Sequence, residues 1–171
     1  MNSYIEPSYN ILCKVFKEKT YSARALSGEN SLNDAATRIV YGVLDKNTEL
    51  EYIINSLCAK KPRESVKIIL KIGAYCLLYM DNLPDYAIVN ETVEFVKSLG
   101  KGGAAGFVNA VLMRVARREY KVLKPQDTDY LSVKYSKPDW FIKRLFKEYG
   151  EAARAILDEP QPDEEHIRIN G

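Results

Sequence analysis

Apolar residues recur at intervals of three and four along most of this chain, a spacing that predicts helices rather than strands. They are densest from Val66 to Met80, where polar side chains occupy only every fourth position: Lys67, Lys71, Tyr75 and Tyr79. A helix whose polar residues form one narrow stripe is buried on most of its sides. The two lysines leave the segment short of the ~20 apolar residues that a membrane span needs. We therefore predict a core helix around which the other helices pack.

The same periodicity predicts a group of three helices before the core helix. They cover residues 7–19, a segment capped by Ser31 or Asn33, and residues 48–59. After the core helix, a helix from residue 85 to 99 is expected to end at Gly100, because glycine favours helix C-termini. Another helix follows the glycine-rich loop 100–106.

Beyond Lys121 the pattern predicts a helical extension. Short helices are expected at 128–135, after Pro138 as far as Gly150, and at 151–157. No strand pattern of useful length appears before Ile167. The predicted fold is all-α, with about seven helices up to Lys121 and two or three beside them. We divide the chain into a main helical domain (1–121), the extension (122–157) and a linker with a final short segment (158–171).

The charge distribution is more informative than the formal net charge of +2. Residues 97–121 contain six basic residues and one acidic one, whereas residues 158–165 contain five acidic residues and no basic one.

The three cysteines show no close pairing that would suggest a metal site or a disulfide framework. With no signal peptide or membrane span in the pattern, we expect a cytoplasmic protein.

The helix after the glycine loop carries the strongest candidate chemistry. We expect Phe107 and four aliphatic residues to face inward, and a continuous basic edge at positions i, i+3, i+4 and i+7: Arg114, Arg117, Arg118 and Lys121. Such an edge suits phosphates, although a solvated helix face has the same pattern. The loop could present backbone N–H groups to a phosphate beside Lys101, or be a simple turn, and the two are compatible. Phe107 could instead stack on an unpaired base.

Three segments resemble the signature of NusB-type RNA-binding domains: Leu70–Tyr75, Leu83–Glu94 and Gly106–Leu112. The last, with the arginines that follow it, is more similar to the version fused to bacterial 16S rRNA (cytosine-5)-methyltransferases of the Sun (RsmB) family. The segment His166–Asn170 resembles the strand that leads into the catalytic half of those enzymes. We therefore expect this chain to be part of a longer enzyme whose catalytic domain it lacks.

The resemblance implies an RNA-binding accessory domain that helps an S-adenosylmethionine-dependent methyltransferase engage 16S rRNA, with the catalytic domain as its partner in cis. The cofactor is expected only in that other domain, because no cysteine here follows a proline and no strand, glycine loop and helix unit is present. We assign no catalytic, cofactor-binding or metal-binding residue and expect no membrane partner. The candidate RNA-binding residues are Lys101, Phe107, Arg114, Arg117, Arg118 and Lys121.

Two other functions remain open. A stand-alone NusB-type antitermination factor would carry several arginines at the start of its first helix, where this chain has the segment Tyr4–Pro7. A protein-interaction module would dock on the catalytic domain and leave the basic edge solvated. We interpret Asn90, Glu91 and Asn109 as hydrogen-bonding residues that fix helix packing, and Trp140 as a structural anchor.

Overall fold

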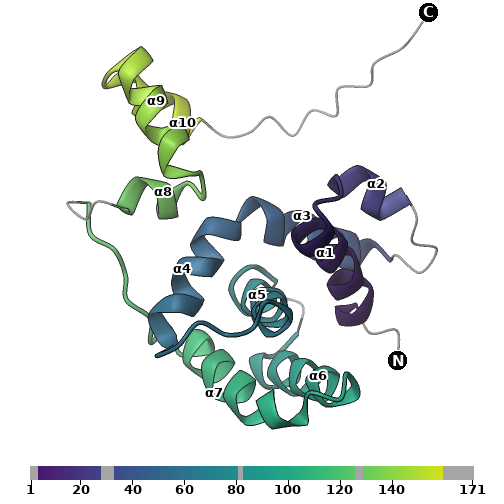
Figure 1. The fold of residues 1–171 in the computed structure, drawn as a ribbon. Helices are drawn as coiled ribbons and strands as arrows, with labels where there is room; N and C mark the ends of the chain where they lie inside the picture. The colour runs from purple at the N-terminus through teal and green to yellow at the C-terminus, as the bar shows by residue number, and fades with distance from the viewer. Residues whose placement is uncertain (1–3, 28–32, 81–82, 126–128, 160–171) are drawn as a thin grey trace, which may run out of the picture.

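The computed structural model describes residues 4–27, 33–80, 83–125 and 129–159, apart from the side chains of Ala23, Leu26 and Ser27, and its regular elements are helices (Figure 1). The helices before the core are α1 (Ile5–Glu18), α2 (Ser22–Ser27), α3 (Asp34–Asp45) and α4 (Asn47–Leu57). The central group is α5 (Glu64–Tyr79), α6 (Asp85–Ser98), the short 3-10 helix η1 (Gly102–Ala104) and α7 (Ala105–Ala116). The last helices are α8 (Tyr130–Lys134), α9 (Asp139–Tyr149) and α10 (Ala152–Asp158). Within these ranges no residue forms a strand, which confirms the all-α prediction.

Helix α5 is the core helix. It packs against α1, α3, α4, α6 and α7, which surround it in Figure 1. Burial goes further than the sequence predicts, because the polar stripe is covered as well: Lys71 is 2% exposed and Tyr75 is 7% exposed. The stripe faces α4, where the Tyr79 hydroxyl donates to Glu49 Oε2 at 2.6 Å. Polar partners on α4 therefore allow α5 to be buried on every side.

The N-terminal group differs from its prediction in two ways. Helix α2 has no counterpart among the predicted elements, and α1 begins at Ile5, two residues before Pro7. Asn33 caps α3, since its Oδ1 accepts the backbone N–H of Ala36 at 2.8 Å. The alternative cap, Ser31, lies outside the described residues. In the described part of the chain before α5, four helices thus occur in place of the predicted three.

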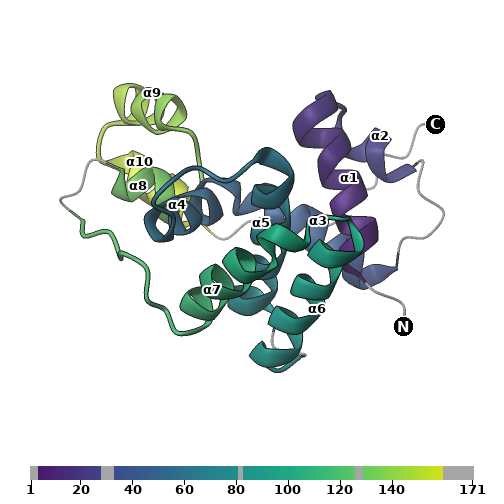
Figure 2. The same cartoon turned by 60° about the horizontal axis from the view of Figure 1, so that its bottom comes forward.

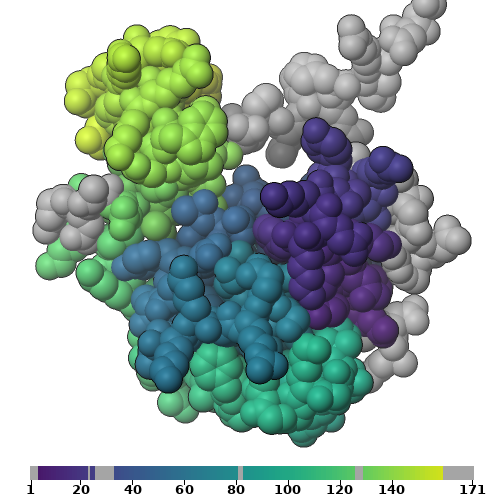
Figure 3. All heavy atoms as spheres, in the orientation of Figure 1, coloured from purple at the N-terminus to yellow at the C-terminus, as the bar shows by residue number. Residues whose placement is uncertain are grey.

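The last three helices, α8 to α10, form the predicted extension, which contacts the main bundle through α8 and α4. In Figures 1 and 2 the extension lies beside the α4 side of the bundle, and Figure 3 shows α9 and α10 as a lobe that protrudes from it. All three helices were predicted within about two residues, including the end of α9 at Gly150. The predicted strand His166–Asn170 and most of the acidic linker lie outside the described residues. Among the helices that can be examined, none has the length and apolar character required to cross a membrane.

Candidate functional site

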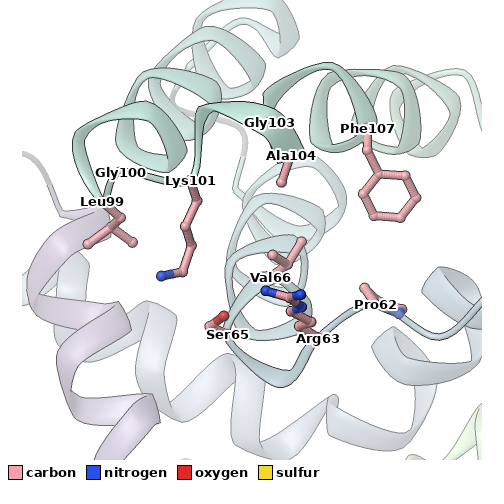
Figure 4. A pocket seen from close by; sticks show the side chains of 10 residues that line it. All are labelled: Pro62, Arg63, Ser65, Val66, Leu99, Gly100, Lys101, Gly103, Ala104 and Phe107. Carbon is pink, nitrogen blue, oxygen red and sulfur yellow. The ribbon is translucent and has the colours of Figure 1, made fainter.

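A hollow of about 640 Å³ lies between the start of α5 and the connection from α6 to α7 (Figure 4). Figure 4 shows the side chains of Lys101 and Phe107 pointing from that connection and from α7 toward the start of α5. The hollow is lined by Pro62, Arg63, Ser65, Val66, Leu99, Gly100, Lys101, Gly103, Ala104 and Phe107. Two of the six predicted site residues, Lys101 and Phe107, therefore meet here.

Gly100 gives this site its local geometry. Its φ of 68° lies in the left-handed region, which glycine adopts without steric cost. The Gly100 N–H donates to Lys97 O at 2.9 Å and the Lys101 N–H donates to Val96 O at 3.1 Å, a hydrogen-bond pattern that ends α6. The chain then turns through η1 into α7, so Lys101 is placed on the hollow. The prediction that Gly100 ends this helix is confirmed.

The hollow is suited to an anion. It combines two cationic side chains, Arg63 and Lys101, with the N-terminal ends of α5 and α7, where the helix dipole favours negative charge. Among the residues that the structure describes, neither cation lies within 4.0 Å of a carboxylate, because the nearby Glu64 pairs with Lys67 at 3.1 Å. Both charges are therefore available to a ligand such as a phosphate.

Phe107 is not the inward-facing residue that helical periodicity predicts. Its side chain is 39% exposed and lines the hollow, whereas Val108 is fully buried. Position 107 lies at the edge of the apolar face of α7, next to a gap that α5 leaves open, and periodicity alone cannot show such a gap. An exposed aromatic ring beside two cations can stack on a nucleobase.

The predicted basic edge on α7 is wrong in its geometry. The helix ends at Ala116, and Arg118 adopts a left-handed conformation with φ 57°. The N–H groups of Arg118 and Glu119 donate to Val115 O and Arg114 O, both at 2.9 Å, which closes the helix as a Schellman motif. Because the chain turns away at Arg118, the spacing i, i+3, i+4 and i+7 does not place Lys121 on the α7 surface.

The basic residues therefore form two groups at opposite ends of α7, about 18 Å apart for a 12-residue helix. Arg114 Nη1 donates to Leu57 O at 3.2 Å, and Glu119 lies 3.5 Å from Arg114 and 3.8 Å from Arg117. These partners offset part of the charge at the C-terminal end. Lys121 lines a different hollow, between α4 and α8.

Arg63 is the site residue that sequence analysis missed. It stands at the N-cap of α5, 38 positions before Lys101, so no local charge pattern joins the two. A signal was present in the Lys-Lys-Pro-Arg sequence at 60–63, since a basic run before a helix N-terminus suits an anion site. Only the packing of α7 on α5 brings this run to the glycine loop.

The polar residues considered for other roles also have defined positions. Asn90 and Asn109 are exposed, so the predicted buried hydrogen bonds that would fix helix packing are wrong for these two.

Glu91 is half-buried, and burial together with the Glu91 charge raises the pKa of the Cys76 thiol to about 12. A thiol with that pKa stays protonated at neutral pH and is a poor nucleophile. No group of three or more potential metal-binding His, Cys, Asp or Glu side chains occurs among the described residues.

The chain is similar in sequence to a known protein family and to several characterised or probable enzymes. The model of the NusB family matches residues 8–117. A probable ribosomal RNA small subunit methyltransferase B of Bacillus subtilis (strain 168) is 30% identical over 172 residues, covering 93% of this chain and 38% of that protein. A protein of the same name from Synechocystis is 33% identical over 127 residues, covering 71% of this chain and 28% of its own length. The chain thus spans about a third of the length of these relatives.

Proposed function

Because the chain belongs to the NusB family, we propose that it is an RNA-binding accessory domain that helps an rRNA cytosine-5 methyltransferase engage 16S rRNA. The names of its relatives support ribosomal RNA as the partner. A methyltransferase domain in cis would carry the catalysis and bind S-adenosylmethionine, and the protein would act in the cytoplasm. In this proposal the present chain binds and positions RNA without catalysing methyl transfer.

The observation that carries the proposal is the hollow between α5 and α7. Arg63 and Lys101 supply positive charge, residues at the N-terminal ends of α5 and α7 line the hollow, and Phe107 offers an exposed ring. Phosphate contacts of this kind give affinity with little sequence readout. Arg114, Arg117, Arg118 and Lys121 would form a second, weaker contact region that begins in the last turn of α7 and continues beyond its C-terminal end.

The start of α1 supports the accessory domain over the stand-alone antitermination factor. Ile5 is 1% exposed and lies in the core, and Ser8 is fully buried, where its hydroxyl donates to Tyr4 O at 2.7 Å. This end of α1 therefore contributes to helix packing, and the arginine-rich RNA contact of classical NusB proteins has no equivalent at these positions. In this proposal RNA contacts the hollow at the N-terminal end of α5, whereas the start of α1 lies near Cys76 toward the other end of that helix.

Salt-dependent binding of a labelled single-stranded fragment of 16S rRNA tests the proposal. If about four phosphates are contacted, the log–log salt slope should be roughly −3. The variant Arg63→Gln/Lys101→Gln should weaken binding and flatten the slope by about one to one and a half units. The matched control Arg38→Gln/Lys124→Gln removes one arginine and one lysine charge from exposed positions that do not line the hollow.

The outcomes separate the candidate functions. If Arg63→Gln/Lys101→Gln and its control bind RNA equally, the hollow is not the RNA site. Arg117→Gln/Arg118→Gln then shows whether the second region carries the binding. If the unmodified chain shows no salt-dependent RNA binding, a protein-interaction module that docks on the catalytic domain becomes the better explanation.

A further inference from the structure

Helix α9 carries a second surface that combines basic and aromatic side chains. Its outward residues follow the spacing i, i+3, i+4 and i+7, which places them on one helix face: Trp140, Lys143, Arg144 and Lys147. Trp140 is 65% exposed, which corrects its prediction as a structural anchor. An open hollow on this face is lined by Lys143, Arg144, Lys147 and Glu148. We call this set, from Trp140 to Lys147, the α9 face.

The opposite side of α9 is already used for packing. Ile142 is 6% exposed, and Leu145 and Phe146 are half-buried, on a helix that packs against α8 and α10. Arg154 of α10 lies over the Phe146 ring at 5.7 Å. Most of the apolar stripe of α9 is therefore covered, and only Tyr149 at its C-terminal end is strongly exposed, at 54%. The opposite side of the helix exposes three cations and the ring of Trp140.

The cations of the α9 face have only exposed ion-pair partners. Lys143 lies 2.6 Å from Asp139 and Arg144 lies 3.0 Å from Glu148, and all four side chains are about half exposed or more. Solvated pairs of this type contribute little to stability, so a phosphate can replace the carboxylate at small cost. Among the described residues, no carboxylate lies within 4.0 Å of Lys147.

We infer that the α9 face binds single-stranded RNA, with Trp140 stacked on an unpaired base and the three cations on the backbone phosphates. A groove of positive charge with an aromatic platform is the combination that binds single strands. From Trp140 to Lys147 the helix rises roughly 10 Å, about three steps of a stacked strand. The inference rests on the proposed function in that the partner is again RNA, but it concerns a different surface.

The chain offers a direct probe, because Trp140 is its only tryptophan. Addition of a short oligouridylate to the full chain should produce a saturable decrease in tryptophan emission as the bases stack on the indole. Polyglutamate carries negative charge without bases, so it should leave the emission unchanged. Equal quenching by polyglutamate would contradict base stacking and indicate an acidic peptide as the occupant.

Two variants test the two parts of the surface. Trp140→Ala should weaken binding of labelled oligouridylate by roughly fivefold to a hundredfold, with partial rescue by Trp140→Phe. Lys143→Gln/Arg144→Gln/Lys147→Gln should flatten the salt slope by about two units. The control Lys17→Gln/Arg38→Gln/Lys124→Gln removes the same charges from exposed positions outside α9. Circular dichroism should show unchanged helix content, since all substituted side chains are exposed.

The two proposals fail in distinguishable ways. If the RNA binds through Arg63 and Lys101 while Trp140 emission stays constant and the α9 charge variant matches its control, the α9 inference is overturned and the proposed function stands. If quenching is seen and Arg63→Gln/Lys101→Gln has no effect, the α9 face binds RNA and the hollow does not. If oligouridylate does not bind at all, both are wrong for single strands.

Discussion

At the scale of single residues, one glycine determines how closely two helices approach. Gly42 of α3 packs on the Tyr75 ring of α5, and a Cβ atom placed on Gly42 would lie 2.0 Å from Tyr75 Cζ and 2.2 Å from its hydroxyl oxygen. Tyr75 cannot move away freely, because its ring is 7% exposed and stacks on Tyr79 with a centroid distance of 5.3 Å. The ring therefore fills the space that a side chain at position 42 would need.

Gly42→Ala should destabilise the fold by about 1–3 kcal/mol, because the added methyl group overpacks this contact. In a Tyr75→Ala background, Gly42→Ala should leave the free energy of unfolding nearly unchanged or increase it, because alanine is more favourable than glycine in a helix by about 1 kcal/mol. Urea unfolding of the two single variants and the double variant measures this coupling. A similar cost of Gly42→Ala in both backgrounds would show that the Tyr75 ring is not the obstacle.

Residue-level predictions from sequence succeeded where a backbone conformation depends on residue type. Gly100 ends α6 in a left-handed conformation, as its identity predicts. Arg118 ends α7 in the same conformation, but arginine gives no such signal, so the helix and its basic edge were extended too far. Phe107 and Trp140 were likewise misplaced, because their exposure depends on gaps between helices that are distant in sequence.

At the scale of elements, α4 and α5 are joined by a buried polar network. Lys71, whose side chain is 3% exposed, donates to Asn47 Oδ1 at 2.7 Å and to Glu51 Oε2 at 3.1 Å. Lys67 lies 3.2 Å from the other carboxylate oxygen of Glu51. Burial lowers the pKa of Lys71, and the Glu51 charge opposes this effect. Burial would raise the pKa of Glu51, but Lys71 and then Lys67 bring it below its ordinary value.

Glu51→Gln should therefore destabilise the protein at neutral pH by about 1–3 kcal/mol, a range reduced because the carboxylate is one-third exposed. Because the pKa of Glu51 is lower in the folded protein, the ionised carboxylate stabilises the fold fully above its unfolded-state pKa of about 4.3. This contribution disappears as the pH falls through the lower pKa that Glu51 has in the folded state. The penalty of Glu51→Gln should thus shrink toward zero below about pH 4. Lys71→Met, which removes the buried charge and leaves Glu51 paired with Lys67, should destabilise the protein less than Glu51→Gln does.

Urea unfolding at neutral and acidic pH measures both effects. A pH-independent penalty for Glu51→Gln, or a larger penalty for Lys71→Met than for Glu51→Gln, would contradict this account of the network. The sequence predicted both helices, and it predicted Lys71 as part of a polar stripe. It could not predict that the stripe is buried, because Asn47 and Glu51 are 24 and 20 positions away from Lys71.

At the scale of the whole molecule, the candidate site and the attachment of the extension also depend on contacts between residues that are distant in sequence, which the sequence pattern does not predict. The sequence predicted Lys101 and the glycine loop but not Arg63, since only tertiary packing joins them. It predicted α8 to α10 but not how they contact the bundle. That contact includes the start of α4, where Lys46 at the N-cap position offers no side-chain acceptor. Ser136, 88 positions later than Thr48, supplies it.

Ser136 occupies the role of an N-cap residue from outside the helix. Its Oγ accepts the N–H groups of Thr48 at 3.1 Å and Glu49 at 3.4 Å, which are the second and third residues of α4 and the usual partners of a capping side chain. Ser136 is 8% exposed and has a left-handed φ of 50°. The cap therefore links the fold of the main bundle to the position of the extension.

Ser136→Ala should destabilise the protein by about 1 kcal/mol, the usual effect of losing a capping hydroxyl. Because these hydrogen bonds join two parts of the molecule, the extension should also detach more often, and trypsin should cleave the connection after Lys121 faster. Ser98→Ala is the matched control, since the Ser98 hydroxyl bonds only within its own helix, to Phe95 O at 2.8 Å. If both variants are cleaved at the same rate in this connection, the Ser136 cap does not hold the extension, and the apolar contact of α8 with α4 must provide the attachment.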